Sequence, residues 1–165
     1  MGTDHALVVA DSGPLIALAG VDCLAVLRGL FARVVMPTVV RDEIMAPPPG
    51  RPGAAAILTA DWLEVLSPPL PPDPFVREAL DYGEAAVIAL ARSLGNATVL
   101  IDEKRGRRVA ATAYRLEVIG TAGVLVRAKA SGLVPSVSAI LRRIRENGYF
   151  LSDKLVRETL ARAGE

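Results

Sequence analysis

Residues 6–10 have the sequence ALVVA, and residues 11–14 have the sequence DSGP. A short apolar run rich in valine predicts a buried β-strand, and the Gly-Pro pair predicts that this strand stops at Asp11. Comparable runs occur at residues 33–36 (RVVM), 62–66 (WLEVL), 98–101 (TVLI) and 116–119 (LEVI). Strands that alternate with helices predict a three-layer α/β/α fold, with a central, mostly parallel sheet of four to five strands.

Helices are expected between these strands and after the last one. Asp22 and Thr38 belong to the residue types that cap helix N-termini, so we expect them to cap the second and third helices. Gly95 is expected just beyond a helix end, where a left-handed glycine often stops a helix. The expected helices cover residues 15–19, 22–31, 37–45, 54–60, 75–82, 84–94, 103–114, 122–130, 136–146 and 153–163.

Proline and glycine interrupt the chain at residues 46–53 (APPPGRPG), which we expect to form a loop. The stretches beside it are too short for separate domains, so we expect one domain over residues 1–165. No apolar run approaches the roughly 18 residues of a membrane span, and residues 1–5 lack the features of a signal peptide. We therefore expect a cytoplasmic protein that makes no membrane contact.

The sequence contains one cysteine, Cys23, and one histidine, His5. This composition excludes an internal disulfide framework and a Cys/His zinc cluster. We expect Cys23 to be a small buried hydrophobic residue and His5 to lie on a frayed terminus. A metal site in this chain would have to use carboxylates, which favour hard cations such as Mg²⁺ or Mn²⁺.

Charge is distributed unevenly along the chain. Residues 1–101 contain six basic and eleven acidic side chains, whereas residues 102–165 contain thirteen basic and seven acidic ones. A fold that joins the two parts would set an acidic pocket beside a basic rim, which suits a polyanionic substrate. An ordinary arginine-rich helix surface would explain the same distribution, and charge alone does not choose between them.

Two aspartates directly follow predicted strands. Asp11 comes after the first strand, and Asp102 comes after the strand over residues 98–101. Ligands of parallel α/β sheets bind beyond the carboxyl ends of the strands, so both side chains lie where a site is expected. Aspartate in this place is also a common helix N-cap, and that alternative stays open for each.

Helical geometry separates Glu43 from its neighbour Asp42. At roughly 100° per residue, Val39, Val40 and Ile44 define one apolar face of their helix. Glu43 lies about 40° from the centre of that face, and Asp42 lies about 140° away. A carboxylate on an apolar face is costly without a partner, and a metal ion is one such partner. We therefore predict that Glu43 points inward and Asp42 into solvent.

Glu84 begins the clearest predicted helix. The helix dipole favours an acidic residue in a first turn by about 0.3–1 kcal/mol, which explains Glu84 without any site. Ala85, Ala86 and Ala89 keep this end of the helix slim, so it can approach the sheet closely. Asp81 is a weaker candidate for the same role.

Five blocks of this sequence resemble the PIN-domain superfamily, and more narrowly its VapC-like proteins, which begin with the pattern V-x-D-S-x-P-L-I-x-L. They are residues 9–18 (VADSGPLIAL), 37–44 (PTVVRDEI), 83–91 (GEAAVIALA), 100–104 (LIDEK) with 108–110 (RVA), and 119–125 (IGTAGVL). The blocks follow the order of the family. No single block would be specific, but the ordered set is.

The resemblance implies a PIN-like fold and a metal-dependent ribonuclease that uses Mg²⁺ or Mn²⁺. It places Asp11, Glu43, Glu84 and Asp102 at the acidic positions of the family, and Ser12 and Thr121 at the polar positions beside the metal. VapC toxins often have two aspartates near the fourth strand. Here Glu103 follows Asp102, and whether Glu103 faces the site or solvent stays open. Ser12 and Thr121 are also good helix-capping types, so that alternative stays open too.

These carboxylates suit phosphodiester hydrolysis, which needs an activated water and relief of charge on the leaving oxygen. Two cations about 3.5–4 Å apart can supply both. We expect Asp11 as the central ligand and Asp102 as the second, with Glu43 and Glu84 as outer or bridging ligands that orient water. Repulsion among the carboxylates predicts that at least one of their pKa values is raised when no cation is bound.

The resemblance further implies the toxin of a type II toxin–antitoxin pair, acting on RNA, forming a homodimer and silenced by a small antitoxin. Helices around Val124, Leu133 and Leu155 are candidates for these protein contacts, although core packing would explain them as well. Two alternatives remain. One is a PIN-fold module that binds RNA or protein without cleaving, and the other is an RNA-processing nuclease with no antitoxin.

Lys129, Arg105 and Arg108 are candidates for contacts with the nucleic-acid backbone, or else ordinary solvated residues of helix faces. Two other enzyme classes with an aspartate after the first strand are excluded. A haloacid-dehalogenase-like phosphatase needs a second acidic residue two positions later, where this chain has Gly13. A receiver-type phosphoacceptor needs an acidic pair at this strand end, and Ser12 follows Asp11 instead.

Overall fold

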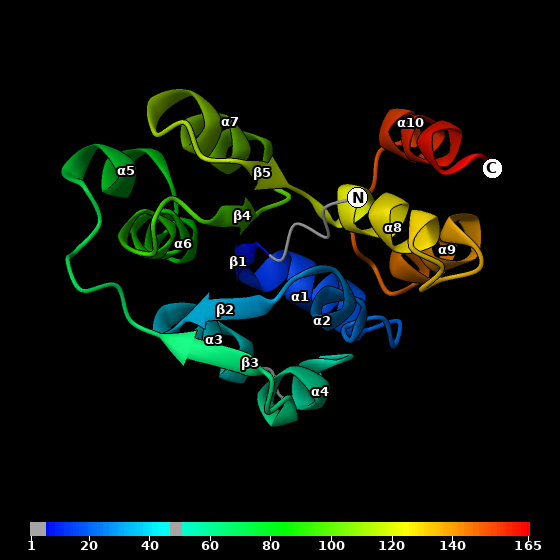
Figure 1. The fold of residues 1–165 in the computed structure, drawn as a ribbon, viewed down its shortest axis with the longest axis horizontal. Coiled ribbons are helices and arrows are strands. Elements are labelled where there is room, and N and C mark those ends of the chain that lie inside the picture. The colour runs from blue at the N-terminus through cyan, green and yellow to red at the C-terminus, as the bar shows by residue number, and fades with distance from the viewer. Residues whose placement is uncertain (1–5, 47–50) are drawn as a thin grey trace.

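A five-stranded parallel sheet forms the centre of the molecule in the computed structural model, which describes residues 6–46 and 51–165 (Figure 1). The strands are β1 (Leu7–Ala10), β2 (Arg33–Pro37), β3 (Leu63–Leu66), β4 (Thr98–Leu100) and β5 (Val118–Ile119). Their order is β3-β2-β1-β4-β5, with parallel pairing throughout these residues. The predicted α/β fold is thus confirmed, and β3 is an edge strand as expected.

Helices flank this sheet and fill the connections between its strands. They are α1 (Ser12–Ala19), α2 (Val26–Leu30), α3 (Thr38–Met45), α4 (Ala54–Thr59), α5 (Pro74–Ala79), α6 (Tyr82–Ser93), α7 (Lys104–Ala113), α8 (Thr121–Ala130), α9 (Val137–Glu146) and α10 (Asp153–Ala163). α6 packs against β1, β2 and β4, while α8, α9 and α10 gather at the opposite end of the molecule from α5 (Figure 1). Among the residues that the structure describes, no helix combines the length and apolar character needed to cross a membrane.

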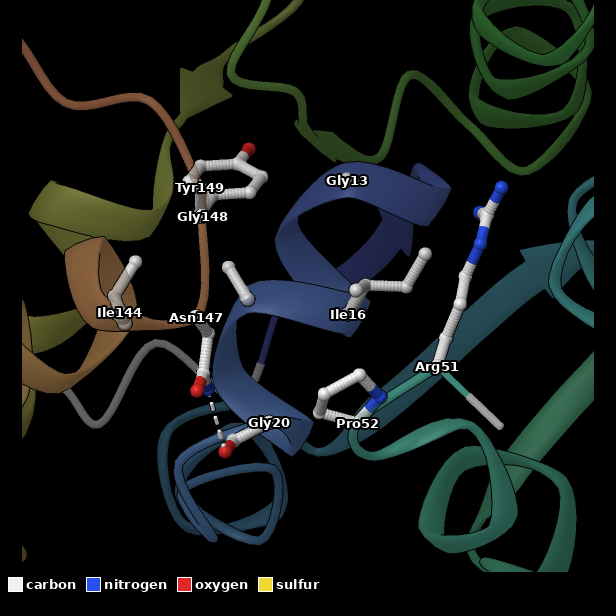
Figure 2. A pocket seen from close by; sticks show the side chains of 10 residues that line it. Gly13, Ile16, Gly20, Arg51, Pro52, Ile144, Asn147, Gly148 and Tyr149 are labelled. Atoms are coloured by element: carbon white, nitrogen blue, oxygen red, sulfur yellow. Dashed lines mark hydrogen bonds between the residues drawn. The ribbon is translucent and has the colours of Figure 1, made fainter. Parts of the chain in front are cut away.

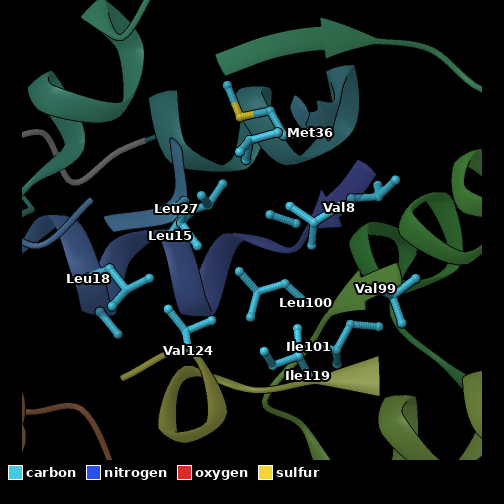
Figure 3. Packing of buried hydrophobic residues seen from close by; sticks show 14 of the residues in the cluster. Val8, Leu15, Leu18, Leu27, Met36, Val99, Leu100, Ile101, Ile119 and Val124 are labelled. Carbon is cyan, nitrogen blue, oxygen red and sulfur yellow. The ribbon is translucent and has the colours of Figure 1, made fainter. Parts of the chain in front are cut away.

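The central strand β1 is buried on both faces, which explains its uninterrupted apolar sequence. Val8, Val9 and Ala10 have no exposed surface. Figure 3 shows Leu15 and Leu18 from α1 in the same cluster as residues of β4, β5 and α8. Full burial of one such leucine or valine side chain stabilises the fold by about 1.5–3 kcal/mol. These contacts fix β1 and α1, and therefore the turn between them.

Two expected helix caps are wrong. Asp22 has a left-handed φ of +59° and lies in turns before α2, where Ala25 is at the N-cap position. Aspartate tolerates this conformation better than most residues, and the turn moves the helix start three residues onward. Thr38 is already inside α3, and its hydroxyl shares a 2.6 Å hydrogen bond with Ser67 instead of capping.

Two other local predictions hold, one fully for Gly95 and one in part for Cys23. Gly95 has a φ of +78° just after α6, as expected for a glycine that ends a helix. Cys23 is partly buried against the hydrophobic core. The predicted loop at 46–53 falls partly outside the described residues, as does His5, and Arg51 and Pro52 precede α4 without regular structure.

The carboxyl ends of β1 and β4 stop at the same level of the sheet. Ala10 is paired with Leu100, and the backbone N–H of Asp11 donates to the carbonyl of Leu100 at 3.0 Å. The residues that follow each strand therefore leave the sheet side by side. This edge, and the N-termini of the helices that follow, carry the candidate site.

Candidate active site

Asp11 occupies the N-cap position of α1 but does not cap it. Its backbone is extended, and its side chain accepts no capping hydrogen bond. The residue is only 9% exposed. An uncapped helix start with a buried carboxylate is not what a structural aspartate provides. The capping alternative for Asp11 therefore does not describe its role in this fold.

Glu43 points inward from α3, whereas Asp42 points into solvent, as the helical geometry predicted. The carboxylate of Glu43 accepts a 3.1 Å hydrogen bond from the hydroxyl of Ser12, at the start of α1. Asp42 is exposed and forms an ion pair with its neighbour Arg41. Ser12 thus uses its hydroxyl to position a site carboxylate.

Glu84 lies in the first turn of α6 and is 4% exposed. Asp81 caps this helix by accepting a 2.8 Å hydrogen bond from the backbone N–H of Glu84. The side chain of Glu84 is therefore free of any capping duty, although the helix start favours its charge. Asp81, which the sequence indicated only weakly, is exposed but lies beside the other carboxylates.

Asp102 is held by three donors from the C-terminal half of the chain. Its Oδ1 accepts from the backbone N–H of Thr121 at 2.7 Å, and its Oδ2 accepts from the Thr121 hydroxyl at 2.6 Å. The hydroxyl of Tyr149 also donates to Oδ2. A carboxylate has about four lone-pair directions, so these contacts leave about one, on Oδ1. Neither Asp102 nor Thr121 occupies an N-cap position, although Asp102 accepts from the first backbone N–H of α8.

Glu103 has a different role from Asp102. It is exposed, occupies the N-cap position of α7 and accepts a hydrogen bond from the backbone N–H of Arg105. Its charge nevertheless raises the pKa values of Glu84 and Tyr149, after the larger effect of their burial. We call the sheet edge that carries Asp11, Glu43, Glu84 and Asp102 the acidic edge. Glu103 is therefore a helix cap at its margin.

The electrostatics of this edge are unfavourable for bare carboxylates. Burial, followed by the charges of Asp81, Glu84 and Glu43, raises the pKa of Asp11 to about 7, although the Ser12 backbone amide opposes the shift. Burial and the charge of Asp81 raise the pKa of Glu84 to about 7. The pKa of Glu43 is also raised, first by burial, against the hydrogen bond from Ser12. Mutual repulsion in a poorly solvated site thus favours protonation, as predicted.

Glycines give these carboxylates their space. An added Cβ at Gly83 would lie 2.6 Å from Glu43 Oε1, and one at Gly106 would lie 2.9 Å from Glu84 Oε1. At Gly120 it would lie 2.9 Å from Asp102 Oδ1. Each distance is shorter than a real Cβ contact allows, so a larger residue would displace the carboxylate. Three different elements therefore leave room for the acidic side chains.

The donor set fits a hard divalent cation. Within residues 6–46 and 51–165, no three His, Cys, Asp or Glu side chains are arranged so that they could hold a metal ion. The buried Asp11 and Glu84 nevertheless carry oxygen donors only, form no ion pair among the described residues, and have pKa values raised first by burial and then by repulsion from neighbouring carboxylates. A divalent cation would relieve that repulsion, and carboxylate oxygens favour Mg²⁺ or Mn²⁺.

Tyr149 is the site residue that the sequence did not indicate. It lies between α9 and α10, 47 positions from Asp102. Gly13 makes room for its hydroxyl, since a Cβ there would lie 3.1 Å from that oxygen. Burial and then the charge of Asp102 raise the pKa of Tyr149, so the hydroxyl stays a donor. No local pattern marks this tyrosine, because its position depends on how the last helices pack.

The candidate basic residues fall into two groups. Lys129 forms a 3.0 Å ion pair with Glu165, which also accepts from the backbone N–H of Val137 at the start of α9. Lys129 therefore has a structural partner. Arg105 and Arg108 are exposed on α7, which begins just after Asp102.

Comparison with known families identifies the family of the chain. Residues 7–165 match the family model DUF3368, described as a PIN domain. The match covers almost the whole chain, so the protein belongs to this PIN-domain family. Neither the curated proteins nor the solved structures gave a match.

Proposed function

We propose that this PIN-domain protein is a metal-dependent endoribonuclease that hydrolyses RNA phosphodiester bonds at the edge formed by β1 and β4. PIN domains are typically nucleases. The observation that supports the proposal most strongly is the buried, uncapped Asp11, whose pKa is raised to about 7 beside Glu84 and Glu43. A fold keeps such a costly group where a bound cation offsets the cost.

Asp11 and Glu84 would hold Mg²⁺ or Mn²⁺, with Glu43 beside them. Asp102 could contribute the one lone pair of Oδ1 that accepts no hydrogen bond from Thr121 or Tyr149. When bound, the cation supplies an activated water and relieves charge on the leaving oxygen. The protein contributes orientation. Ser12 fixes Glu43, while Thr121 and Tyr149 fix Asp102. Such supporting hydrogen bonds typically change metal affinity or activity by about 10–100-fold.

A nucleic-acid substrate is supported by the basic helix that starts at the acidic edge, and RNA is the substrate that the VapC-like resemblance implies. Lys104, Arg105 and Arg108 are exposed on α7, immediately after Asp102 and Glu103. These positively charged side chains would contact the phosphate backbone while the scissile phosphate lies at the carboxylates. Such contacts fix position and carry no base sequence, so the RNA target is not encoded in them.

We further propose that the protein is the toxin of a type II toxin–antitoxin pair and acts as a homodimer. Leu133 is 44% exposed and Leu155 is 39% exposed, so both are available for contacts with a second copy or an antitoxin. Val124 has no exposed surface and is a core residue instead. The reading frame beside this gene tests the toxin role. A short antitoxin-like frame supports it, and its absence favours RNA processing.

Cleavage of structured RNA by the purified protein tests the nuclease proposal. We expect cleavage in Mg²⁺ or Mn²⁺, none in EDTA, and a loss of at least about 100-fold for Asp11→Asn. Asp42→Asn is the matched control, because it changes an exposed aspartate that faces away from the site, and it should cleave normally. Failure to cleave with either cation would leave the alternative of a PIN-fold module that only binds RNA or protein.

A further inference from the structure

A pocket of about 330 Å³ adjoins the acidic edge (Figure 2). Its walls come from α1, from the residues before α4, and from the segment that follows α9. Ile16 and Ile144 supply apolar surface, and the side chain of Asn147 is fixed by a 2.9 Å hydrogen bond to the carbonyl of Gly20. The hydrogen bond of Asn147 thus ties the segment after α9 to the end of α1.

None of the four candidate carboxylates lines the pocket, but three of its lining residues are linked to one of them. Gly13 lies in the turn that begins with Asp11. Tyr149 lines the pocket with its ring while its hydroxyl donates to Asp102. Arg51 lines it as well, and its charge acts on Glu43. A group bound here would be next to whatever occupies the acidic edge.

We propose that this pocket receives the nucleoside adjacent to the scissile phosphate, and the inference rests on the proposed nuclease function. A phosphodiester is covalently flanked by two nucleosides, so one of them must lie beside the carboxylates during cleavage. The volume is near the lower end of the usual range for ligand pockets, about 300–1,000 Å³, which suits one nucleoside rather than a longer segment.

The lining chemistry matches this occupant. The ring of Tyr149 is an aromatic surface against which a base can stack, and stacking tolerates different bases. Ile16 and Ile144 would cover apolar parts of the nucleoside. Arg51, which lines the pocket (Figure 2) and whose charge acts on Glu43, would meet the phosphate that joins this nucleoside to its neighbour.

Abasic substrates test the proposal directly. The wild-type cleavage position is first mapped on a short RNA, and the base on each side of it is then removed in turn, leaving the ribose. We expect one of the two abasic RNAs to lose at least about fivefold in kcat/KM, the effect typical of one stacked base. Ile16→Trp, which fills the pocket, should cause a similar loss on intact RNA and little further loss on that abasic RNA.

Ala139→Trp is the matched control, because Ala139 is exposed and lines a separate pocket of about 570 Å³, and no residue of that pocket forms a hydrogen bond or ion pair with a site carboxylate among the described residues. It should cleave intact RNA normally. Cleavage of both abasic RNAs at the intact rate would overturn the pocket assignment and leave the nuclease proposal standing, even if Ile16→Trp fails to fold. Absence of any RNA cleavage by the wild type in Mg²⁺ or Mn²⁺ would remove both proposals.

Discussion

At the scale of single residues, Gly83 determines the space available to Glu43. An alanine Cβ there would lie 2.6 Å from Glu43 Oε1, so the carboxylate must move. We expect Gly83→Ala to lower RNA cleavage by at least about tenfold, because small displacements of catalytic groups are costly. Gly29→Ala is the control, since its Cβ meets only the flexible side chain of exposed Leu133. Equal cleavage by the two variants would argue against a site role for Glu43.

Tyr149 offers a second prediction at this scale. Tyr149→Phe removes one of the three donors to Asp102, and we expect metal-dependent kcat/KM to fall by about 10–100-fold. Tyr114→Phe also breaks a tyrosine–aspartate hydrogen bond, to exposed Asp73, and should leave kinetics unchanged. Each variant loses one tyrosine–aspartate hydrogen bond. If the role of Tyr149 were only structural, Tyr149→Phe and Tyr114→Phe would have the same kcat/KM at similar stability, and that result would contradict the prediction.

At the scale of elements, the N-terminus of α6 combines a cap with a repulsive charge. Asp81 caps α6 by accepting from the backbone N–H of Glu84. Its charge adds to the effect of burial in raising the pKa values of Asp11 and Glu84. Asp81→Asn keeps a capping side chain but removes the charge. We therefore expect the metal-free variant to melt at a higher temperature than the metal-free wild type at pH 8. Asp81→Ala loses the cap, which costs about 0.5–2 kcal/mol, and should melt below Asp81→Asn. Identical melting of the two variants would rule out this division of roles.

Most elements could be predicted because their signals are local. The apolar run before Asp11, the glycine after α6 and the inward face of Glu43 all follow from periodicity and backbone preference. The errors at Asp22 and Thr38 arise because a capping residue type was present but another interaction used it. Asp22 takes a left-handed turn and its carboxylate pairs with Arg143 of α9, while Thr38 bonds with Ser67 from a neighbouring connection. Tertiary partners of this kind are invisible in a local pattern.

At the scale of the whole molecule, the acidic edge makes stability depend on pH. The folded-state pKa values of Asp11 and Glu84 are about 7, against ordinary values of 3.8 and 4.5 for these side chains. Because the folded values are raised, this contribution to stability is fully present below about pH 4 and is lost as pH rises through 7. In EDTA, we expect the melting temperature to fall between pH 5 and pH 8.

Mn²⁺ should reverse this loss, because a cation that binds only the folded state stabilises it. The rise in melting temperature on adding Mn²⁺ should therefore be larger at pH 8 than at pH 5, where protons compete for the carboxylates. Asp11→Asn should show a flatter pH profile in EDTA. A wild-type melting temperature that rises steadily from pH 5 to pH 8 in EDTA would refute the prediction.

The candidate site could be predicted only in part. Asp11 and Asp102 follow from strand ends, because parallel strands bring their carboxyl ends to one edge. The sequence gives no means of ranking the carboxylates by environment. In the structure, Asp11, Glu84 and Glu43 lie close enough for their charges to repel one another. Asp102 instead accepts hydrogen bonds from Thr121 and Tyr149. That difference depends on the packing of α8 and the chain after α9, which brings distant donors to the edge.

Direct binding of Mn²⁺ tests the central claim that this edge is a metal site. Calorimetric titration at pH 8 should show binding to the wild type and to Asp42→Asn, which alters only an exposed carboxylate. Asp11→Asn should bind at least about tenfold more weakly, because it removes a buried carboxylate donor. Absence of Mn²⁺ binding to the wild type, or equal affinity of wild type and Asp11→Asn, would contradict the account.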